Sequence, residues 1–348
     1  MTGRRVLVCD DSPLLRRVIA DMLTDGGMTI AGEARDGLQL VEEARRLRPD
    51  VITLDVEMPR RNGIDGLRAL MAEVPTPVVM VSSLTGRGTA ATVEALAAGA
   101  VDAVQKPTMR LTPDGWGAAR DELLGAVRAA ATARVASLAR AGRAPRPGAA
   151  LARRAGADGG PLVIIACSTG GPRALQQLLP RLPAPLGAGL LIVQHMPPGF
   201  TSSLARRLDA GAALAVREAG PHEAIRPDTA WIARAGNHLE VTARGRLALT
   251  DAPPVGALRP RADITLESAA RHYGGDIVAV VLTGMGDDGL AGCAAVRAAG
   301  GRVLAEDETT AVVWGMPGAV VAAGHADAVV PLDAIPLALS AMVAGPGR

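Results

Sequence analysis

The 348-residue chain is poor in aromatic side chains and in lysine. It has one Phe, one Tyr and three Trp, so its cores must be built from Val, Leu, Ile, Ala and Met. The basic side chains are almost all arginine, and Lys106 is the one candidate for any site that needs an ammonium group. The formal net charge of +2 is too small to indicate general affinity for nucleic acid or for membrane surfaces.

Cysteine and long apolar runs are also scarce. Cys9, Cys167 and Cys293 lie far apart and form no C-x-x-C pair, which excludes a disulfide scaffold and favours a reducing compartment. The apolar run near the N-terminus is too short for a signal-peptide core, and no stretch approaches the ~18 apolar residues of a membrane span. We therefore expect a cytoplasmic protein that does not insert into the membrane.

Strand and helix signals alternate regularly through the first part of the chain. Continuous apolar runs predict strands at residues 4–11, 28–34, 50–58, 76–83 and 101–107. The segments between and after them predict helices at residues 12–23, 37–47, 63–74, 92–100 and 116–141. Five such units predict an α/β domain whose parallel sheet is covered by helices on both faces.

Residues 142–160 lose this periodicity and are rich in Pro, Gly, Ala and Arg, which predicts a linker between domains at residues 1–141 and 161–348. The second domain repeats the alternation, with strands expected at residues 161–168, 187–195, 276–284 and 301–307. Four shorter strand-like segments, at residues 214–219, 229–235, 238–241 and 247–250, interrupt it. We interpret the second half as another α/β domain with a mixed insertion.

Polar residues follow the apolar strands of the first domain. In sequence order they are Asp10, Asp11, Asp55, Ser82 and Lys106. Ligands of open α/β sheets bind outside the carboxyl ends of the strands, and three carboxylates gathered there need a cation such as Mg²⁺. An aspartate beside that ion is able to attack a phosphoryl donor. Any one of these aspartates is equally explained as a helix cap, but the ordered set favours the phosphoryl site.

The motifs DD at 10–11, LDVEMP at 54–59, VSS at 81–83 and QKP at 105–107 resemble the signature of two-component receiver domains over residues 4–130. The resemblance implies a flavodoxin-like, five-stranded parallel sheet of order 2-1-3-4-5. It implies Asp55 as the phosphoacceptor and Ser82 and Lys106 as the switch pair. Asp10, Asp11 and Asp55 would bind Mg²⁺.

The second domain places a serine, a histidine and a carboxylate after three apolar strands. Ser168 lies at a strand-to-helix turn, His195 ends the next strand, and Asp287 and Asp288 follow a later one. A serine becomes a nucleophile when a base and an orienting carboxylate join it. Ser168 taken alone is usually a cap or a phosphate ligand, and its surroundings do not match G-x-S-x-G. The glycines around Asp287 and Asp288 offer the alternative of a phosphate-cradling loop, but this half of the chain has no Walker lysine. We interpret the other histidines as structural: His222, His238, His272 and His325.

Six spaced motifs of the second domain, spread over residues 162–318, resemble the protein-glutamate methylesterases of bacterial chemotaxis. They are CSTGG, QHMPPGFT, AGNHLEV, RPRADITLESAA, LTGMGDDG and ETTAVVWGMP. The resemblance implies a doubly wound α/β methylesterase domain. Ser168 would be its nucleophile, His195 its general base and acid, and Asp288 rather than Asp287 the carboxylate that orients the imidazole. The backbone amides of Thr169 and Met285 would form the oxyanion hole.

The resemblance also implies an activity and its partners. The enzyme would hydrolyse γ-methyl esters of receptor glutamates, release methanol, deamidate receptor glutamines and need no cofactor for the esterase reaction. Its partners would be methylated chemoreceptor helices and, as phosphodonor, a chemotaxis histidine kinase. The unphosphorylated receiver would cover the esterase cleft, and phosphorylation of Asp55 would relieve this inhibition. The alternative is a non-catalytic adaptor or a phosphate sink.

Residues beside the predicted triad leave alternatives open. We expect Cys167 to be a small buried residue rather than a nucleophile, because burial raises a thiol's pKa. Met196, Met285 and Met316, with Phe200 beside them, either fill gaps in the core or line an apolar rim for a receptor helix. Arg259 and Arg261 either steer acidic receptor surfaces or are simply solvated.

Overall fold

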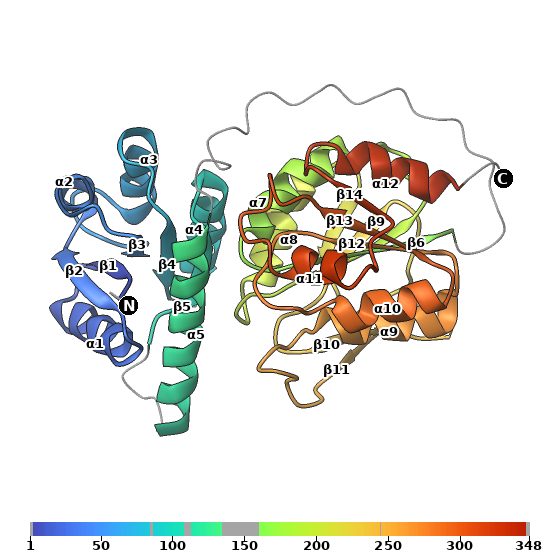
Figure 1. Cartoon of the computed structure of the whole chain (residues 1–348), viewed down its shortest axis with the longest axis horizontal. Helices are drawn as coiled ribbons and strands as arrows, with labels where there is room; N and C mark the ends of the chain where they lie inside the picture. Colours follow the sequence, from blue (N-terminus) through green and yellow to red (C-terminus); the bar gives the residue numbers. More distant parts are fainter. Residues whose placement is uncertain (1–2, 84–85, 108–112, 134–159, 244, 346–348) are drawn as a thin grey trace. The chain divides into compact units, whose positions relative to one another are not determined.

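The computed structural model describes residues 3–83, 86–107, 113–133, 160–243 and 245–345. The chain forms two compact units, Met1–Arg140 and Ala141–Arg348 (Figure 1). The linker predicted at residues 142–160 lies outside the described residues except for Gly160, and so does the end of the predicted 116–141 helix beyond residue 133.

Five parallel strands form the sheet of the first unit, in the predicted order β2-β1-β3-β4-β5. The strands are β1 (Arg5–Cys9), β2 (Thr29–Ala34), β3 (Val51–Asp55), β4 (Val78–Ser82) and β5 (Asp102–Gln105). Every residue of β3 and β4 is buried, as expected for central strands that are covered on both faces.

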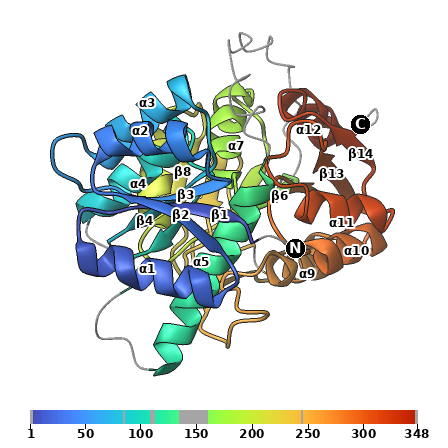
Figure 2. The same cartoon turned by 60° about the vertical axis from the view of Figure 1, so that its left-hand side comes forward.

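Helices cover both faces of this sheet, with α1 and α5 in contact on one face and α2, α3 and α4 packed in succession on the other (Figure 2). They are α1 (Pro13–Asp25), α2 (Gly37–Leu47), α3 (Gly63–Glu73), α4 (Gly86–Ala98) and α5 (Pro113–Thr132). Side chains cap the starts of α1 and α2. The Ser12 hydroxyl accepts a hydrogen bond from the Leu15 amide, and the Asp36 carboxylate accepts two amides at the start of α2. These helices therefore begin directly after the strand ends.

The second unit is built on a seven-stranded sheet of order β14-β13-β12-β6-β7-β9-β8. Its strands are β6 (Leu162–Cys167), β7 (Gly189–Gln194), β8 (Ala215–Glu218), β9 (Thr229–Ile232), β12 (Ile277–Val281), β13 (Arg302–Glu306) and β14 (Ala328–Val330). All neighbouring strands are parallel. The order reverses at β6, which has β7 on one side and β12 on the other, so ligands are expected beyond the carboxyl end of β6.

The predicted mixed insertion is smaller than expected. Strands β8 and β9 belong to the main parallel sheet, and the insertion reduces to the antiparallel pair β10 (His238–Val241) and β11 (Leu247–Thr250). The connection over residues 219–228 contains no helix. Without the crossover helix that usually joins parallel strands, the sequence pattern gave no sign that β8 and β9 are parallel.

The helices of the second unit are α7 (Gly171–Leu178), η1 (Leu179–Arg181), α8 (Thr201–Asp209), α9 (Ala262–Tyr273), α10 (Leu290–Ala298), α11 (Met316–Ala322) and α12 (Ile335–Ala344). Helices α9 and α10 lie side by side (Figure 1). The sequence patterns did not predict η1, α11, β14 or α12. None of the described helices combines the length and the apolarity that a membrane span requires.

Alternate residues of the central strands form the core under α9 and α10. Ile164 and Ala166 of β6 and Ala279 of β12 pack with Leu266 of α9 and Val296 of α10, and all are buried. Aliphatic side chains supply most of this core, as the scarcity of aromatic residues predicts. The packing fixes the strand ends beyond which the polar residues lie.

Candidate functional sites

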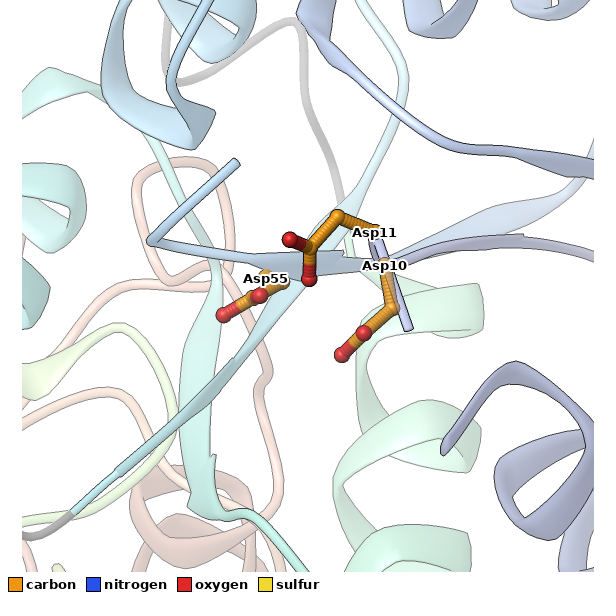
Figure 3. A group of neighbouring side chains, drawn as sticks. All are labelled: Asp10, Asp11 and Asp55. Atoms are coloured by element: carbon orange, nitrogen blue, oxygen red, sulfur yellow. The ribbon is translucent and has the colours of Figure 1, made fainter. Parts of the chain in front are cut away.

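The carboxyl ends of β1 and β3 bring three aspartates together in the first unit (Figure 3). One carboxylate oxygen from each of Asp10, Asp11 and Asp55 lies within 4.8 Å of the other two. Asp10 and Asp55 are buried, and Asp11 is exposed at the mouth of the cluster. A buried pair with a third carboxylate open to solvent suits Mg²⁺, which binds a few carboxylates and keeps several waters.

Lys106 lies between the two buried carboxylates. Its Nζ is 3.0 Å from Asp10 Oδ2 and 2.7 Å from Asp55 Oδ2. Burial raises the pKa of Asp55 to about 6; Lys106 opposes this rise and the charge of Asp10 adds to it. The Lys106 amide donates to the Ser82 carbonyl at 2.8 Å, so the two residues predicted as a switch pair are neighbours. One cation thus holds together two carboxylates that would otherwise repel each other.

Ser168 lies on the sharp turn from β6 into α7. Its amide donates to the Thr283 carbonyl at 3.0 Å, and its carbonyl accepts the Gly171 amide at 2.8 Å. Gly170 has a φ of +82°, a left-handed conformation that favours glycine, and a Cβ there would lie 2.8 Å from the Cβ of Val312. The turn therefore depends on this glycine and on the end of β12.

Gln194 joins the ends of β6 and β7. Its buried side-chain amide donates to the Ser168 carbonyl at 3.0 Å and to the His195 carbonyl at 2.7 Å. Its Oε1 accepts the Cys167 thiol at 3.1 Å. One side chain thus fixes the main chain of both Ser168 and His195. Gln194 was not among the predicted site residues, although its place before His195 at a strand end is a usable signal.

His195 and Asp288 meet at this edge of the sheet. Nε2 of His195 lies 2.7 Å from Oδ2 of Asp288, which is 1% exposed, whereas Asp287 is exposed to solvent. The hydrogen bonds of the described residues include none from the Ser168 hydroxyl to His195. The geometry therefore joins the imidazole to the carboxylate and brings the serine to the adjoining strand end.

Asp288 and Asp263 cap each other's helices. The Asp288 carboxylate accepts the amides of Ala262 at 2.7 Å and of Asp263 at 3.0 Å, at the start of α9. In return, Oδ1 of Asp263 accepts the amides of Gly289 at 2.9 Å and of Gly292 at 2.8 Å, at the start of α10. Each carboxylate satisfies amides that lack a partner inside their own helix. The position of Asp288 is thus fixed by two helix starts.

Arg261 binds both of these carboxylates. Its Nη2 lies 2.8 Å from Asp263 Oδ2, and its Nε lies 3.4 Å from Asp288 Oδ1. Burial alone would raise the pKa of Asp288. Hydrogen bonds from His195 and from the amides of α9, together with the charge of His195, have the larger effect and hold this pKa below its usual value. Arg261 is therefore part of the carboxylate network; neither of the roles expected for it, receptor steering or simple solvation, describes these contacts.

The remaining histidines lie outside the His195–Asp288 pair. His238 is fully buried, accepts the Arg261 amide at Nδ1 at 3.3 Å and lies 3.3 Å from the Pro253 carbonyl through Nε2. His222 and His272 are exposed, and His325 is half-buried. The contacts of His238 join two connecting segments of the insertion, as a structural residue would.

The methionines beside the site have different environments. Met316 is fully buried and fills the core, whereas the side chain of Met285 is 47% exposed. Gly284 precedes Met285, and a Cβ at Gly284 would lie 2.8 Å from the Cβ of Ser168. The chain that carries Met285 therefore passes close to Ser168. The oxyanion roles of the Thr169 and Met285 amides remain predictions.

Cys167 is a buried neighbour of the serine. Its side chain is fully buried, and burial raises the pKa of its thiol well above the ordinary value, with a further increase from the charge of Glu306. A thiol in this state carries almost no thiolate at neutral pH, and the thiolate is the nucleophilic form.

Comparison with known proteins shows which domain family each of the two units matches. Residues 6–112 match the model of the response regulator receiver domain, and residues 163–339 match that of CheB methylesterase. The chain is therefore a carboxylic ester hydrolase joined to a receiver domain. It belongs to the CheB methylesterase family.

Named relatives match this chain over nearly its full length. It is 49% identical to the protein-glutamate methylesterase/protein-glutamine glutaminase of Symbiobacterium thermophilum, with 97% of each chain covered. It is 43% identical to the protein of the same name from Thermotoga maritima, over 99% of this chain and 100% of that one. The crystal structure of the Thermotoga maritima CheB methylesterase catalytic domain is 44% identical, with a TM-score of 0.51, and covers 53% of this chain and 98% of its own.

Proposed function

We propose that this enzyme hydrolyses γ-methyl esters of glutamate side chains on methylated chemoreceptor helices with a Ser168–His195–Asp288 triad. The observation that carries the proposal is the 2.7 Å contact between His195 and Asp288 at the strand edge that also holds Ser168. A carboxylate that binds one imidazole nitrogen fixes the ring and stabilises the imidazolium that forms during the reaction. Because Nε2 faces Asp288, Nδ1 is the nitrogen that would take the serine proton.

The proposed reaction has two halves. Ser168 Oγ attacks the γ-carbonyl carbon while His195 takes the hydroxyl proton. The resulting oxyanion would accept hydrogen bonds from the backbone amides of Thr169 and Met285. The bond to the methoxy group breaks, His195 returns the proton, and methanol leaves. Water, deprotonated by His195, then attacks the acyl-enzyme, His195 returns the proton to Ser168 Oγ as the acyl bond breaks, and the glutamate carboxylate is freed. A receptor glutamine follows the same route with ammonia as the leaving group.

The receiver would control this reaction through phosphorylation of Asp55 by a chemotaxis histidine kinase. Asp10, Asp11 and Asp55 would hold Mg²⁺, which neutralises phosphoryl oxygens when bound. Lys106, now paired with Asp10 and Asp55, would move to the new phosphoryl group, and Ser82 would donate to it. Phosphorylation would thereby relieve inhibition of the esterase.

Methanol release from a methylated receptor tests the enzymatic proposal. The full chain should release methanol, and Ser168→Ala should release none above background. A parent chain that binds the receptor without releasing methanol would favour the alternative of a non-catalytic adaptor or phosphate sink.

The regulatory proposal is tested on the same full chain with a small phosphodonor and Mg²⁺. The phosphodonor should increase methanol release by the parent and leave Asp55→Asn unchanged. An equal response of both proteins would exclude control through Asp55.

A further inference from the structure

Glu306 is a buried carboxyl group that the proposed reaction does not use. It ends β13, is 1% exposed, and lies next to the end of β12. Its Oε2 accepts the Thr283 amide at 2.8 Å, while its own carbonyl accepts the Trp314 indole at 3.2 Å. The side chain has thus taken the place of a strand carbonyl as the acceptor for Thr283.

Thr283 in turn binds the Ser168 turn through two different groups. Its carbonyl accepts the Ser168 amide at 3.0 Å, and its hydroxyl donates to the Thr169 carbonyl at 2.9 Å. The same hydroxyl accepts the Val313 amide at 2.9 Å, which attaches the chain before α11. Thr283 is buried, so these groups have no access to water as a substitute partner.

We propose that Glu306 is a positioning residue for the nucleophile: it fixes Thr283, and Thr283 fixes the main chain of Ser168 and Thr169. The proposal rests on the nucleophilic role of Ser168 set out above. Among the described residues, Glu306 makes no hydrogen bond to the Ser168 hydroxyl or to the His195–Asp288 pair, so its link to the nucleophile runs through Thr283.

The chemistry of the carboxyl group fits this role in either protonation state. Burial raises the pKa of Glu306 to about 7, although hydrogen bonds from Thr283 and Thr310 oppose the rise and Asp307 adds to it. A carboxylate and a carboxylic acid both accept an amide hydrogen bond, and so does the oxygen of a glutamine. Loss of the acceptor, rather than loss of the charge, should therefore displace the turn.

Displacement of the turn should slow the chemical steps more than it weakens substrate binding. A shift of a nucleophile by about 1 Å costs up to 10²-fold in rate. We expect Glu306→Met, which keeps the length of the side chain but removes the acceptor, to lower kcat by about 10- to 100-fold with KM within about twofold. Glu306→Gln should stay within about threefold of the parent, because its amide oxygen still accepts from Thr283.

A fluorophosphonate provides a second measurement that needs no receptor. In its reaction Ser168 Oγ bonds to phosphorus, the serine proton passes to His195, and fluoride leaves. The labelling rate should fall for Glu306→Met by the same factor as kcat and stay near that of the parent for Glu306→Gln. Glu240→Met is the matched control, since Glu240 accepts the Thr250 hydroxyl at 3.3 Å within the β10–β11 pair; it should label like the parent.

A folded Glu306→Met variant that labels like the parent overturns the proposal, and so does a glutamine variant as slow as the methionine one. If Glu306→Met does not fold, Glu306→Asp takes its place, because it keeps the carboxyl group but is one methylene too short to reach the Thr283 amide; it should label about tenfold more slowly. Thr283→Val and Thr283→Ser test the second contact of the relay, from Thr283 to Thr169. The valine removes the hydroxyl that holds Thr169 and should label about tenfold more slowly, as expected for a misplaced nucleophile. Thr283→Ser keeps that hydroxyl and should label like the parent. Normal labelling of Thr283→Val overturns the relay.

The two proposals fail in different ways. A parent chain that labels at Ser168 but releases no methanol would refute the proposed substrate and leave the positioning role intact. A parent chain that does not label at Ser168 would refute both.

Discussion

Nε2 of His195 lies 2.7 Å from Oδ2 of Asp288, although 93 residues separate the two in the chain. The contact forms because the order of strands reverses at β6, so that the chain after β7 and the chain after β12 reach the same edge of the sheet. The buried carboxylate then has one imidazole and two helix amides as partners. The side chain of the neighbouring Asp287 is exposed to solvent.

Asp288→Asn should lower kcat by about 10⁴, the loss found when the orienting aspartate of a serine protease triad is changed in this way. The asparagine no longer stabilises the imidazolium and favours the wrong tautomer of His195. Methanol release at saturating methylated receptor measures the effect. Asp287→Asn is the matched control and should stay within about twofold of the parent, because that side chain is exposed; a larger loss for Asp287→Asn than for Asp288→Asn would contradict the assignment.

Asp263→Ala should lower the free energy of unfolding by about 2–3 kcal/mol, because it leaves the buried amides of Gly289 and Gly292 without their acceptor. Urea denaturation of the full chain, followed by a signal from the second unit, measures the change. Asp251→Ala, at an exposed position after β11, provides the control. Equal stability of the two variants would show that the reciprocal caps contribute little.

Glu306→Gln should alter how stability depends on pH. The folded pKa of Glu306, about 7, lies above the ordinary value of 4.5, so between these values the folded protein holds a proton that the unfolded chain releases. The parent should therefore lose stability relative to the glutamine variant as pH rises through this window, by about 3 kcal/mol at most. Asp307 and Cys167 are the titratable neighbours; burial keeps the Cys167 thiol protonated, and hydrogen bonds from Thr309 lower the pKa of Asp307 and move its titration below the window.

Denaturation of both proteins at about pH 5 and pH 8 measures this difference. A difference in stability that stays constant across the two conditions would mean that Glu306 does not change protonation in the folded state within that range.

Lys106→Met should make the first unit depend on a divalent cation. Without the ammonium group, the buried carboxylates of Asp10 and Asp55 face each other with no positive partner among the described residues. We expect a lower melting temperature in a chelator, and a larger gain from millimolar Mg²⁺ than the parent shows. An identical response of variant and parent to Mg²⁺ would argue against binding at this cluster.

The strand ends were the most predictable part of the fold. Apolar runs that end in Asp10, Asp55, Ser168 and His195 correctly predicted the central strands of both parallel sheets and the edges that carry the candidate sites. Strands β8 and β9 were predicted where they lie, but their place in the main parallel sheet was not, because no helix separates them. The sequence pattern failed for α12, whose residues are almost all apolar and whose Leu337 is 79% exposed, so that no helical stripe stands out.

The supporting residues of the site were harder to predict than the residues of the proposed triad. Asp263 and Arg261 act through contacts between helix starts that no local spacing reveals. Glu306 had a usable signal, since a glutamate at the end of an apolar strand is costly to bury without a partner. That partner, Thr283, follows the end of another strand, β12, and becomes apparent only when the strand order is known.

Lys106 gives the chain a chemical reporter. It is the one lysine in the sequence, and its side chain is 19% exposed between two carboxylates. Burial alone would lower the pKa of its amine. Asp55 and Asp10 have the larger effect and raise this pKa above its usual value, so little of the reactive neutral amine exists while those contacts persist. An acylating reagent would add at most one group to a lysine side chain, and a mass spectrum that follows this addition over time would record how often the acidic cluster opens.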